Sequence, residues 1–189
     1  IGNGSFSFCS KLNIIEFHIC SELKVIGDYA FFNTSIKKIK IPTSVKIIGK
    51  FAFKKCRNFL SVHFPCDSNL QKIDEGAFSK SHIYSISIPS PTKEIGKFAF
   101  SRCKNIKRIE FPNNCELRVL SSFLFFHSSL QMITIPSQIK KIEENAFSYC
   151  YKLESFQFEE NSELEVIDKC AFAFSSLDFI SIPSNVSEI

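Results

Sequence analysis

Cysteine is the residue type in this chain whose spacing could most readily support chemistry. Four of the eight cysteines lie 47 residues apart, and each closes a phrase such as IGKFAFKKC. These four are Cys9, Cys56, Cys103 and Cys150. Thiols at regular intervals could form disulfides or bind a metal. A zinc site needs C-x₂₋₄-C pairs with further cysteine or histidine nearby, and no such pair occurs, so we predict no metal site.

The spacing also argues against disulfides among these four residues. If one coil of the chain takes half of the 47-residue period, the four cysteines lie two coils, or about 9.6 Å, apart. Bridged cysteines have Cα atoms within about 7 Å of one another. Small polar residues take the equivalent places in the coils between: Thr34, Ser81, Ser128 and Ser175. We therefore predict a packing column of cysteine alternating with serine or threonine, since cysteine behaves as a small hydrophobe.

Catalytic motifs are missing from the sequence. The four histidines, His18, His63, His82 and His127, fall at different places in the repeat, so they do not converge with one cysteine or carboxylate. The chain contains no glycine-rich phosphate loop, no H-E-x-x-H and no G-x-S-x-G. An active site needs residues that break a repeat and converge, so we predict a non-enzymatic protein without a cofactor.

The elements that position these residues follow from the repeat itself, whose units alternate between 24 and 23 residues. Pieces such as KIKIP (38–42) and SISIP (85–89) alternate polar and apolar residues, which is typical of a half-buried strand. Proline closes most of these pieces, because it cannot donate to a sheet and belongs at a strand end. About eight such coils are visible, and stacking them on one another would bury a continuous core.

The A-F step of each unit predicts a second layer of the structure. We expect one helical or 3-10 turn there, in which a small alanine lets neighbouring coils approach. The phenylalanines of this step follow alanine in all units but two, where Ser5 and Leu124 stand in its place. They should stack as one aromatic column through the core, where each ring removes roughly 150 to 250 Å² from water. These are Phe6, Phe31, Phe53, Phe78, Phe100, Phe125, Phe147 and Phe172.

Composition supports one solenoid over residues 1–189. Hydrophobic residues make up 44% of the chain, and no stretch of about 18 apolar residues could span a membrane. The net charge of +4 is unevenly spread: Ile36–Asn58 is rich in lysine and has no acid, whereas residues 143–189 are dominated by glutamate and aspartate. The chain opens and stops within a repeat and shows no polar cap, so we expect a fragment of a longer protein.

Two surfaces are candidate binding sites. The first is the outward side of the strands, where core packing does not restrict the residue type. Its members are Lys38, Lys40, Ser61, His63, Ser85, Ser87, Arg108, Glu110, Met132 and Thr134. The second is a basic column two residues after the repeated phenylalanine, formed by Lys55, Lys80, Arg102 and His127. At about 4.8 Å per coil this column would match a linear polyanion such as a sulfated glycan, although an ordinary solvated face has the same composition.

The phrases IPTSVKIIGKFAFKKCRNF, IPSQIKKIEENAFSYCYKL and FEENSELEVIDKCAFAFSSL resemble the BspA-like leucine-rich repeats. The resemblance covers essentially the whole chain, and it departs from the pattern at Ser121, Leu124 and Glu143, which leaves the geometry of residues 120–126 open. It implies a right-handed solenoid with a parallel sheet on one face and short helical turns and loops on the other. Such repeats are typical of surface or secreted proteins of mucosal protozoa and bacteria, implicated in adhesion.

The sequence thus favours a protein-interaction module of a cell-surface or secreted protein, with a protein or glycan ligand on the strand face. An intracellular leucine-rich-repeat scaffold and a structural spacer are the alternatives. Nucleic acid is not expected as a partner, because the basic region shows no nucleic-acid motif and no aromatic stacking platform.

Overall fold

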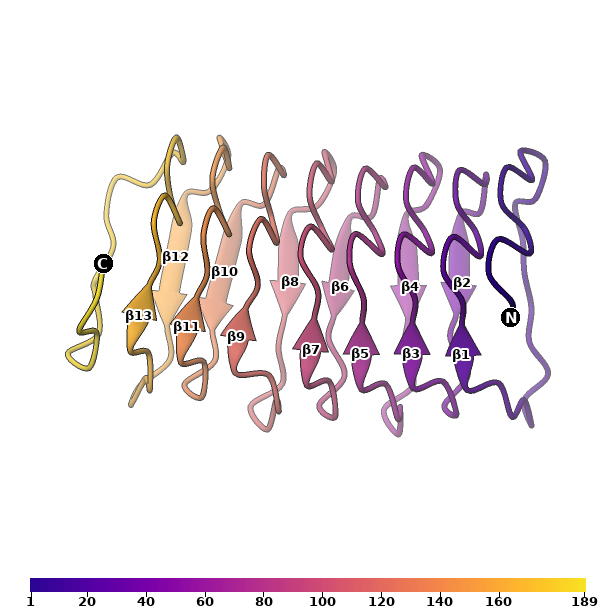
Figure 1. Cartoon of the computed structure of the whole chain (residues 1–189), viewed down its shortest axis with the longest axis horizontal. Helices are drawn as coiled ribbons and strands as arrows, with labels where there is room; N and C mark the ends of the chain where they lie inside the picture. Colours follow the sequence, from indigo (N-terminus) through magenta and orange to yellow (C-terminus); the bar gives the residue numbers. More distant parts are fainter.

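A parallel sheet of six strands forms one face of the molecule. The computed structural model describes every residue from Ile1 to Ile189. The strands are β2 (Lys38–Lys40), β4 (Ser61–His63), β6 (Ser85–Ser87), β8 (Arg108–Glu110), β10 (Met132–Ile135) and β12 (Ser155–Phe158), one from each coil. They lie side by side in chain order along the long axis (Figure 1), as the repeat predicts. We call this the long sheet.

The two faces of the long sheet differ because polar and apolar residues alternate along each strand. In β2 the central Ile39 is 3% exposed while Lys38 and Lys40 point to solvent. The same exposed, buried, exposed pattern recurs in β6 and β8. Because successive side chains of a strand point to opposite sides, the apolar row is directed inward in every coil.

Seven two-residue strands form the opposite face in two sheets. One contains β1 (Val25–Ile26), β3 (Ile47–Ile48), β5 (Lys72–Ile73) and β7 (Glu94–Ile95), and the other β9 (Val119–Leu120), β11 (Lys141–Ile142) and β13 (Val166–Ile167). The break between β7 and β9 lies where Ser121 replaces the usual glycine. There the Ser121 hydroxyl, not its backbone N–H, donates to the carbonyl of Ile95 at 2.5 Å. The sequence departure near residues 120–126 therefore has a structural consequence.

The prediction of helical turns is wrong, because the structure contains no helix. Each A-F step is instead a run of tight turns with two residues at positive φ, such as Tyr29 (φ 55°) and Asn33 (φ 56°). This geometry turns the N–H groups of Tyr29, Phe31 and Asn33 toward the next coil, where they donate to the carbonyls of residues 50, 52 and 54 at 2.8–2.9 Å. Hydrogen bonds between coils thus replace those within a helical turn, and we call this third side the turn face. None of the elements is a helix with the length and apolarity that crossing a bilayer requires.

The interior is one hydrophobic cluster of 44 buried residues. The alanines of the A-F step are 0–3% exposed, as expected for positions where coils approach. The phenylalanine column is also confirmed. From Phe6 to Phe172 consecutive rings are stacked, with centroids 5.2–5.6 Å apart and interplanar angles of 2–18°. Near-parallel rings at this separation are offset stacks, which aromatic quadrupoles favour.

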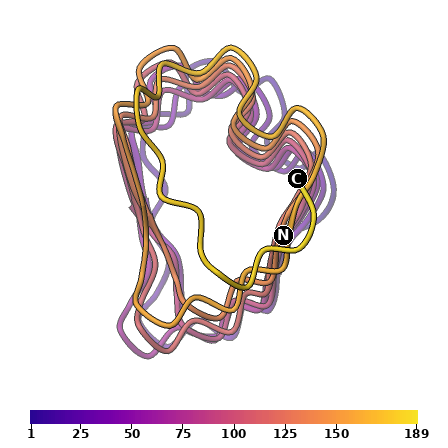
Figure 2. The same ribbon diagram turned by 90° about the vertical axis from the view of Figure 1, so that its left-hand side faces the viewer.

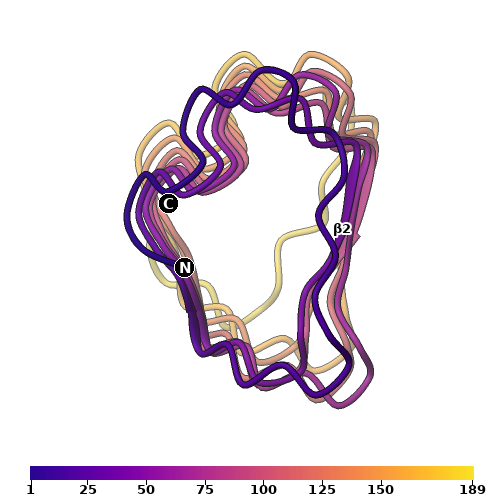
Figure 3. The same ribbon diagram turned by 90° about the vertical axis from the view of Figure 1, so that its right-hand side faces the viewer.

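The two ends depart from the regular array, so the expectation of about eight equivalent coils is too high. The first coil, at the N-terminal end of the stack, faces the viewer in Figure 3. In this coil Ile14 makes only an isolated bridge to Lys38 and is 67% exposed. In the last coil residues 177–182 form no strand, and the chain runs inside the outline of the other coils (Figure 2). Its one β-bridge joins Glu188 to Val166. An end coil packs on a single neighbour, which stabilises it less than an internal one.

Candidate binding surfaces

The strand face presents its predicted residues in two straight rows. Strand register pairs Lys38 with Ser61, Ser61 with Ser85, Ser85 with Arg108, and Arg108 with Met132. The second row pairs Lys40 with His63 and Ser87 with Glu110, and Thr134 continues onto Gln157. All of the ten predicted residues are exposed except Ser61, which is half-buried. The structure therefore brings them onto one continuous surface.

Charge divides this surface into three parts. Lys38 and Lys40 lie at the N-terminal end and form no ion pair. In the middle, an Arg108 guanidinium nitrogen lies 3.0 Å from a Glu110 carboxylate oxygen, and the Ser87 hydroxyl donates to the same carboxylate at 2.6 Å. On β10 and β12 the outward residues carry no charge, and Met132, 49% exposed, is the one large apolar side chain among them. Free positive charge is thus concentrated on β2.

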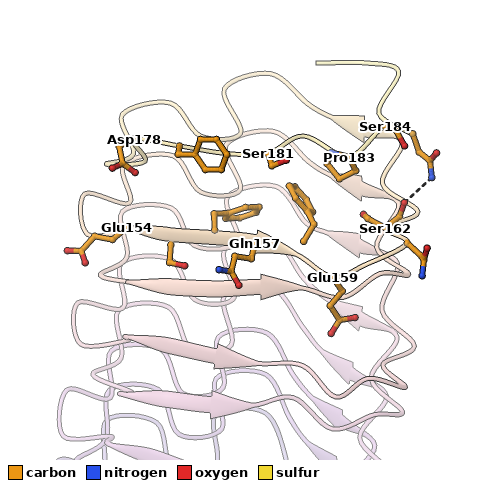
Figure 4. A pocket seen from close by; sticks show the side chains of 14 residues that line it. Glu154, Gln157, Glu159, Ser162, Asp178, Ser181, Pro183 and Ser184 are labelled. Carbon is orange, nitrogen blue, oxygen red and sulfur yellow. Dashed lines mark hydrogen bonds between the residues drawn. The ribbon is translucent and has the colours of Figure 1, made fainter.

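A groove of about 790 Å³ lies at the C-terminal end of the strand face, between β12 and the irregular last coil (Figure 4). Its lining is mainly polar and includes Gln157, Glu159 and Asp178. The Asn185 side chain crosses to the last regular coil and donates to the Ser162 carbonyl at 2.9 Å. Sequence analysis missed this groove because the repeat predicts an eighth strand in its place.

The basic column lies on the turn face, as the spacing predicts. Lys55, Lys80, Arg102 and His127 all have positive φ, between 57° and 63°. Their backbone N–H groups donate to the next coil at 2.8–3.0 Å, which places them in one line. In the following coil Tyr149 takes the same position, and its ring centroid lies 6.1 Å from that of His127.

Aromatic side chains lie among these cations, a feature that sequence analysis missed. Phe98 and Phe123 stack with centroids 4.8 Å apart. The Lys55 ammonium lies 5.4 Å from the Phe32 ring centroid, and the Arg102 guanidinium lies 5.9 Å from that of Phe126. Cations at this distance from a ring are attracted by its negative face. In the sequence these rings are aromatic residues that stand immediately before the alanine of the A-F step or two residues after it. Their side chains reach the surface because of the observed turn, which the sequence pattern did not predict.

All eight cysteines are free thiols. Three cysteines of the predicted packing column, Cys56, Cys103 and Cys150, are fully buried. The Cys103 thiol donates to the Phe78 carbonyl at 3.1 Å and contacts the Ser81 hydroxyl at 3.6 Å. Burial raises the pKa of the Cys103 thiol to about 12 and that of Cys150 to about 11. These thiols are therefore inert packing groups. Cys9 is the exception to the column, since it lies on the first coil and is exposed.

The structure brings together no group of three or more histidine, cysteine or carboxylate side chains that could hold a metal ion. The four histidines remain dispersed: His63 lies on the strand face and His127 on the turn face. The candidate sites are therefore the exposed surfaces and not a metal centre.

A model of the BspA type leucine-rich repeat region matches the sequence in six copies, over residues 1–93 and 71–189. Together these ranges cover the whole chain. The chain belongs to the BspA-type leucine-rich repeat family. No curated protein sequence matches this BspA-type chain significantly. Its repeat fold is typically a non-enzymatic interaction scaffold.

Solved structures share the fold of this BspA-type solenoid. A leucine-rich repeat protein from Bacteroides ovatus is 25% identical, with a TM-score of 0.64 over 85% of this chain and 48% of that protein. The pneumococcal vaccine antigen PcpA is 22% identical, with a TM-score of 0.58 over 89% of this chain and 50% of PcpA. A leucine-rich cell surface protein from Faecalibacterium prausnitzii is 23% identical, with a TM-score of 0.54 over 75% and 44%. The BspA-type chain thus spans about half the length of these structures or less.

Proposed function

We propose that this BspA-type solenoid is a non-enzymatic interaction module of a cell-surface or secreted protein, and that it binds a protein or glycan ligand through the strand face. The observation that carries the proposal is the pair of exposed rows on the long sheet, whose residues vary in chemistry while the core beneath them repeats. The family, together with the solved cell surface protein and vaccine antigen of the same fold, supports the cellular location.

The long sheet offers a rigid and open surface to a ligand. Each strand presents two outward side chains at fixed spacing, and hydrogen bonds to the neighbouring strands hold that spacing without loop rearrangement. A ligand therefore meets preorganised groups, which reduces the entropy lost on binding. The exposed face of a solenoid is also the usual binding surface of repeat proteins.

Charge reversal on β2 tests the placement of the ligand. In a screen against immobilised extracellular-matrix proteins and glycans, the Lys38→Glu/Lys40→Glu/Arg108→Glu variant should lose about tenfold or more in affinity for any ligand that the native chain binds. Most of the loss should come from the two lysines, because Arg108 is already paired with Glu110. The matched control reverses the same number of charges at exposed lysines off the strand face. These are Lys24, Lys46 and Lys97. Equal loss in both variants, or none in the first, would refute the strand face as the site.

Surface labelling of intact source cells tests the location. Biotinylation followed by mass spectrometry should detect peptides of this chain, whereas a cytosolic marker stays unlabelled. Protection of the chain until lysis would favour the second candidate, an intracellular leucine-rich-repeat scaffold, which the eight free thiols also suit. If the chain is labelled and yet binds nothing in the screen, the structural-spacer alternative gains support.

A further inference from the structure

A continuous strip without acidic residues runs along the edge between the turn face and the long sheet. No aspartate or glutamate occurs in residues 54–60, 79–85, 101–107, 126–132 or 149–153, which follow one another in five successive coils. The lysines and arginines of this strip form what we call the basic ledge: Lys54, Lys55, Arg57, Lys80, Arg102, Lys104, Lys107 and Lys152. It contains the lysines and the arginine of the predicted basic column and extends the column toward the strands.

The positive charge of the basic ledge is not neutralised within the molecule. No residue of the ledge forms an ion pair. The cations that do form ion pairs in this molecule are Lys50, Lys72, Lys93, Arg108, Lys140, Lys141 and Lys169. Mutual repulsion is evident at the N-terminal end of the ledge. There, burial and the nearby charges of Lys80 and Lys55 lower the pKa of the Lys54 ammonium. An anion placed along this strip would relieve that repulsion.

A small groove gives the ledge a shaped site. It has a volume of about 310 Å³ and is lined by Tyr84, Lys104, Lys107 and Lys152 with the neutral side chains Asn105, Ser129 and Gln131. Lys104 follows Arg102 of the basic column by two residues, and Ser129 follows His127 by two. The backbone N–H groups of Tyr84, Lys107 and Gln131 each donate to the preceding coil at 2.9–3.0 Å, which fixes the groove wall.

The groove combines the groups that a charged sugar needs. Lys104, Lys107 and Lys152 supply positive charge, and the amide and hydroxyl side chains can exchange hydrogen bonds with sugar hydroxyls. Tyr84 is 52% exposed, and the Lys107 ammonium lies 5.2 Å from its ring centroid. An exposed ring beside a cation offers an apolar surface to the face of a sugar while the cation meets its acid group.

The cations of the ledge have two spacings, and its rings argue against nucleic acid. Arg57 and Lys104 occupy equivalent positions two coils, or about 9.6 Å, apart, with His82 in the coil between. Lys55, Lys80 and Arg102 lie on successive coils, about 4.8 Å apart. A sulfated polysaccharide, whose acid groups project from its sugars at several positions, can meet both spacings. Rings of the turn face such as Phe98 and Phe123 stack on each other, so they leave no open faces on which successive bases could stack.

We propose that the basic ledge binds a linear anionic polysaccharide, sulfated or carboxylated, which lies along the solenoid axis with its acid groups on the cations and a sugar ring on Tyr84. This site is separate from the strand face and does not depend on the function proposed for it. Its affinity falls with ionic strength, because the contacts are between exposed charges.

Heparin binding measured by calorimetry with the 189-residue chain tests the proposal. At about 0.15 M salt the Lys104→Glu/Lys152→Glu variant should bind heparin about tenfold more weakly or worse. The control Lys24→Glu/Lys46→Glu changes the net charge equally but lies at exposed positions off both the ledge and the strand face, and it should change the affinity by less than about twofold. Thermal melting verifies that both variants remain folded.

The Tyr84→Ala variant separates sugar recognition from simple charge attraction. It should weaken heparin binding several-fold, yet leave the binding of inorganic polyphosphate, which has no sugar ring, unchanged. Equal losses in the two charge variants, an identical effect of Tyr84→Ala on heparin and polyphosphate, or tighter binding of single-stranded DNA than of heparin would each overturn the proposal. None of these outcomes bears on ligand binding by the strand face.

Discussion

Removing one ring from the middle of the phenylalanine column should destabilise the whole solenoid. Phe100 is fully buried, and its ring lies 5.5 Å from that of Phe78 and 5.6 Å from that of Phe125. A buried phenylalanine replaced by alanine costs about 3–5 kcal/mol, through lost burial and the cavity left behind. Because a small domain is stable by only about 5–15 kcal/mol, Phe100→Ala should lose a large share of its free energy of unfolding.

The column supplies its own control in Phe6. This ring is only partly buried and stacks on one neighbour, Phe31, at 5.3 Å. Since Phe6 supports one interface between coils and Phe100 supports two, Phe6→Ala should cost roughly 1–2 kcal/mol. Urea denaturation followed by circular dichroism measures both values. A loss for Phe100→Ala no larger than that for Phe6→Ala would refute the argument that stacking between neighbouring coils carries the stability.

A break in the column should also reduce cooperativity. Each coil contacts only its neighbours, so a weak interface at Phe100 allows the two halves of the array to unfold separately. The denaturant dependence of the unfolding free energy, which scales with the surface exposed in one step, should then fall for Phe100→Ala. It should remain at the native value for Phe6→Ala, since fraying at the end leaves the rest of the array intact.

Further predictions concern backbone approach and buried thiols. Gly96→Ala should cost about 1–3 kcal/mol by thermal melting, because its Cβ would lie 2.6 Å from the backbone nitrogen of the preceding coil, whereas Gly4→Ala, with φ of 65° and open space around it, should cost about 1 kcal/mol. Above about pH 9, Cys103 and Cys150 ionise when unfolded but keep their protons when folded, because their folded pKa values are about 12 and 11. The free energy of unfolding should therefore keep its full value below pH 9 and fall above pH 9, by up to about 1.4 kcal/mol per pH unit for each thiol. A Cys103→Ser/Cys150→Ser variant should show a shallower fall. At pH 8 a disulfide reagent should label Cys9 at once and Cys103 and Cys150 only after unfolding; rapid labelling of all three would contradict the packing role.

The repeat determined most of the architecture without tertiary information. Its spacing predicted the register that pairs Lys38 with Ser61, the inward row of Ile39, and the phenylalanine column through Phe100. These features are predictable because each coil contacts only its neighbours, so a residue and its equivalent one coil later are brought together by sequence distance alone. The same reasoning placed the candidate binding rows on one face.

Only the tertiary structure decided the conformation of the turn face and of the two ends. Bulky residues such as Tyr29 and Phe51 have positive φ, which their own preferences disfavour. The hydrogen bond from the Tyr29 N–H to the Lys50 carbonyl belongs to the neighbouring coil, so no local pattern announces it. The aromatic rings beside the basic column and the groove under the last coil arise in the same way. What sequence spacing determined is the pairing of equivalent positions, and what the tertiary structure decided is how the backbone turns when hydrogen bonds between coils outweigh local preference.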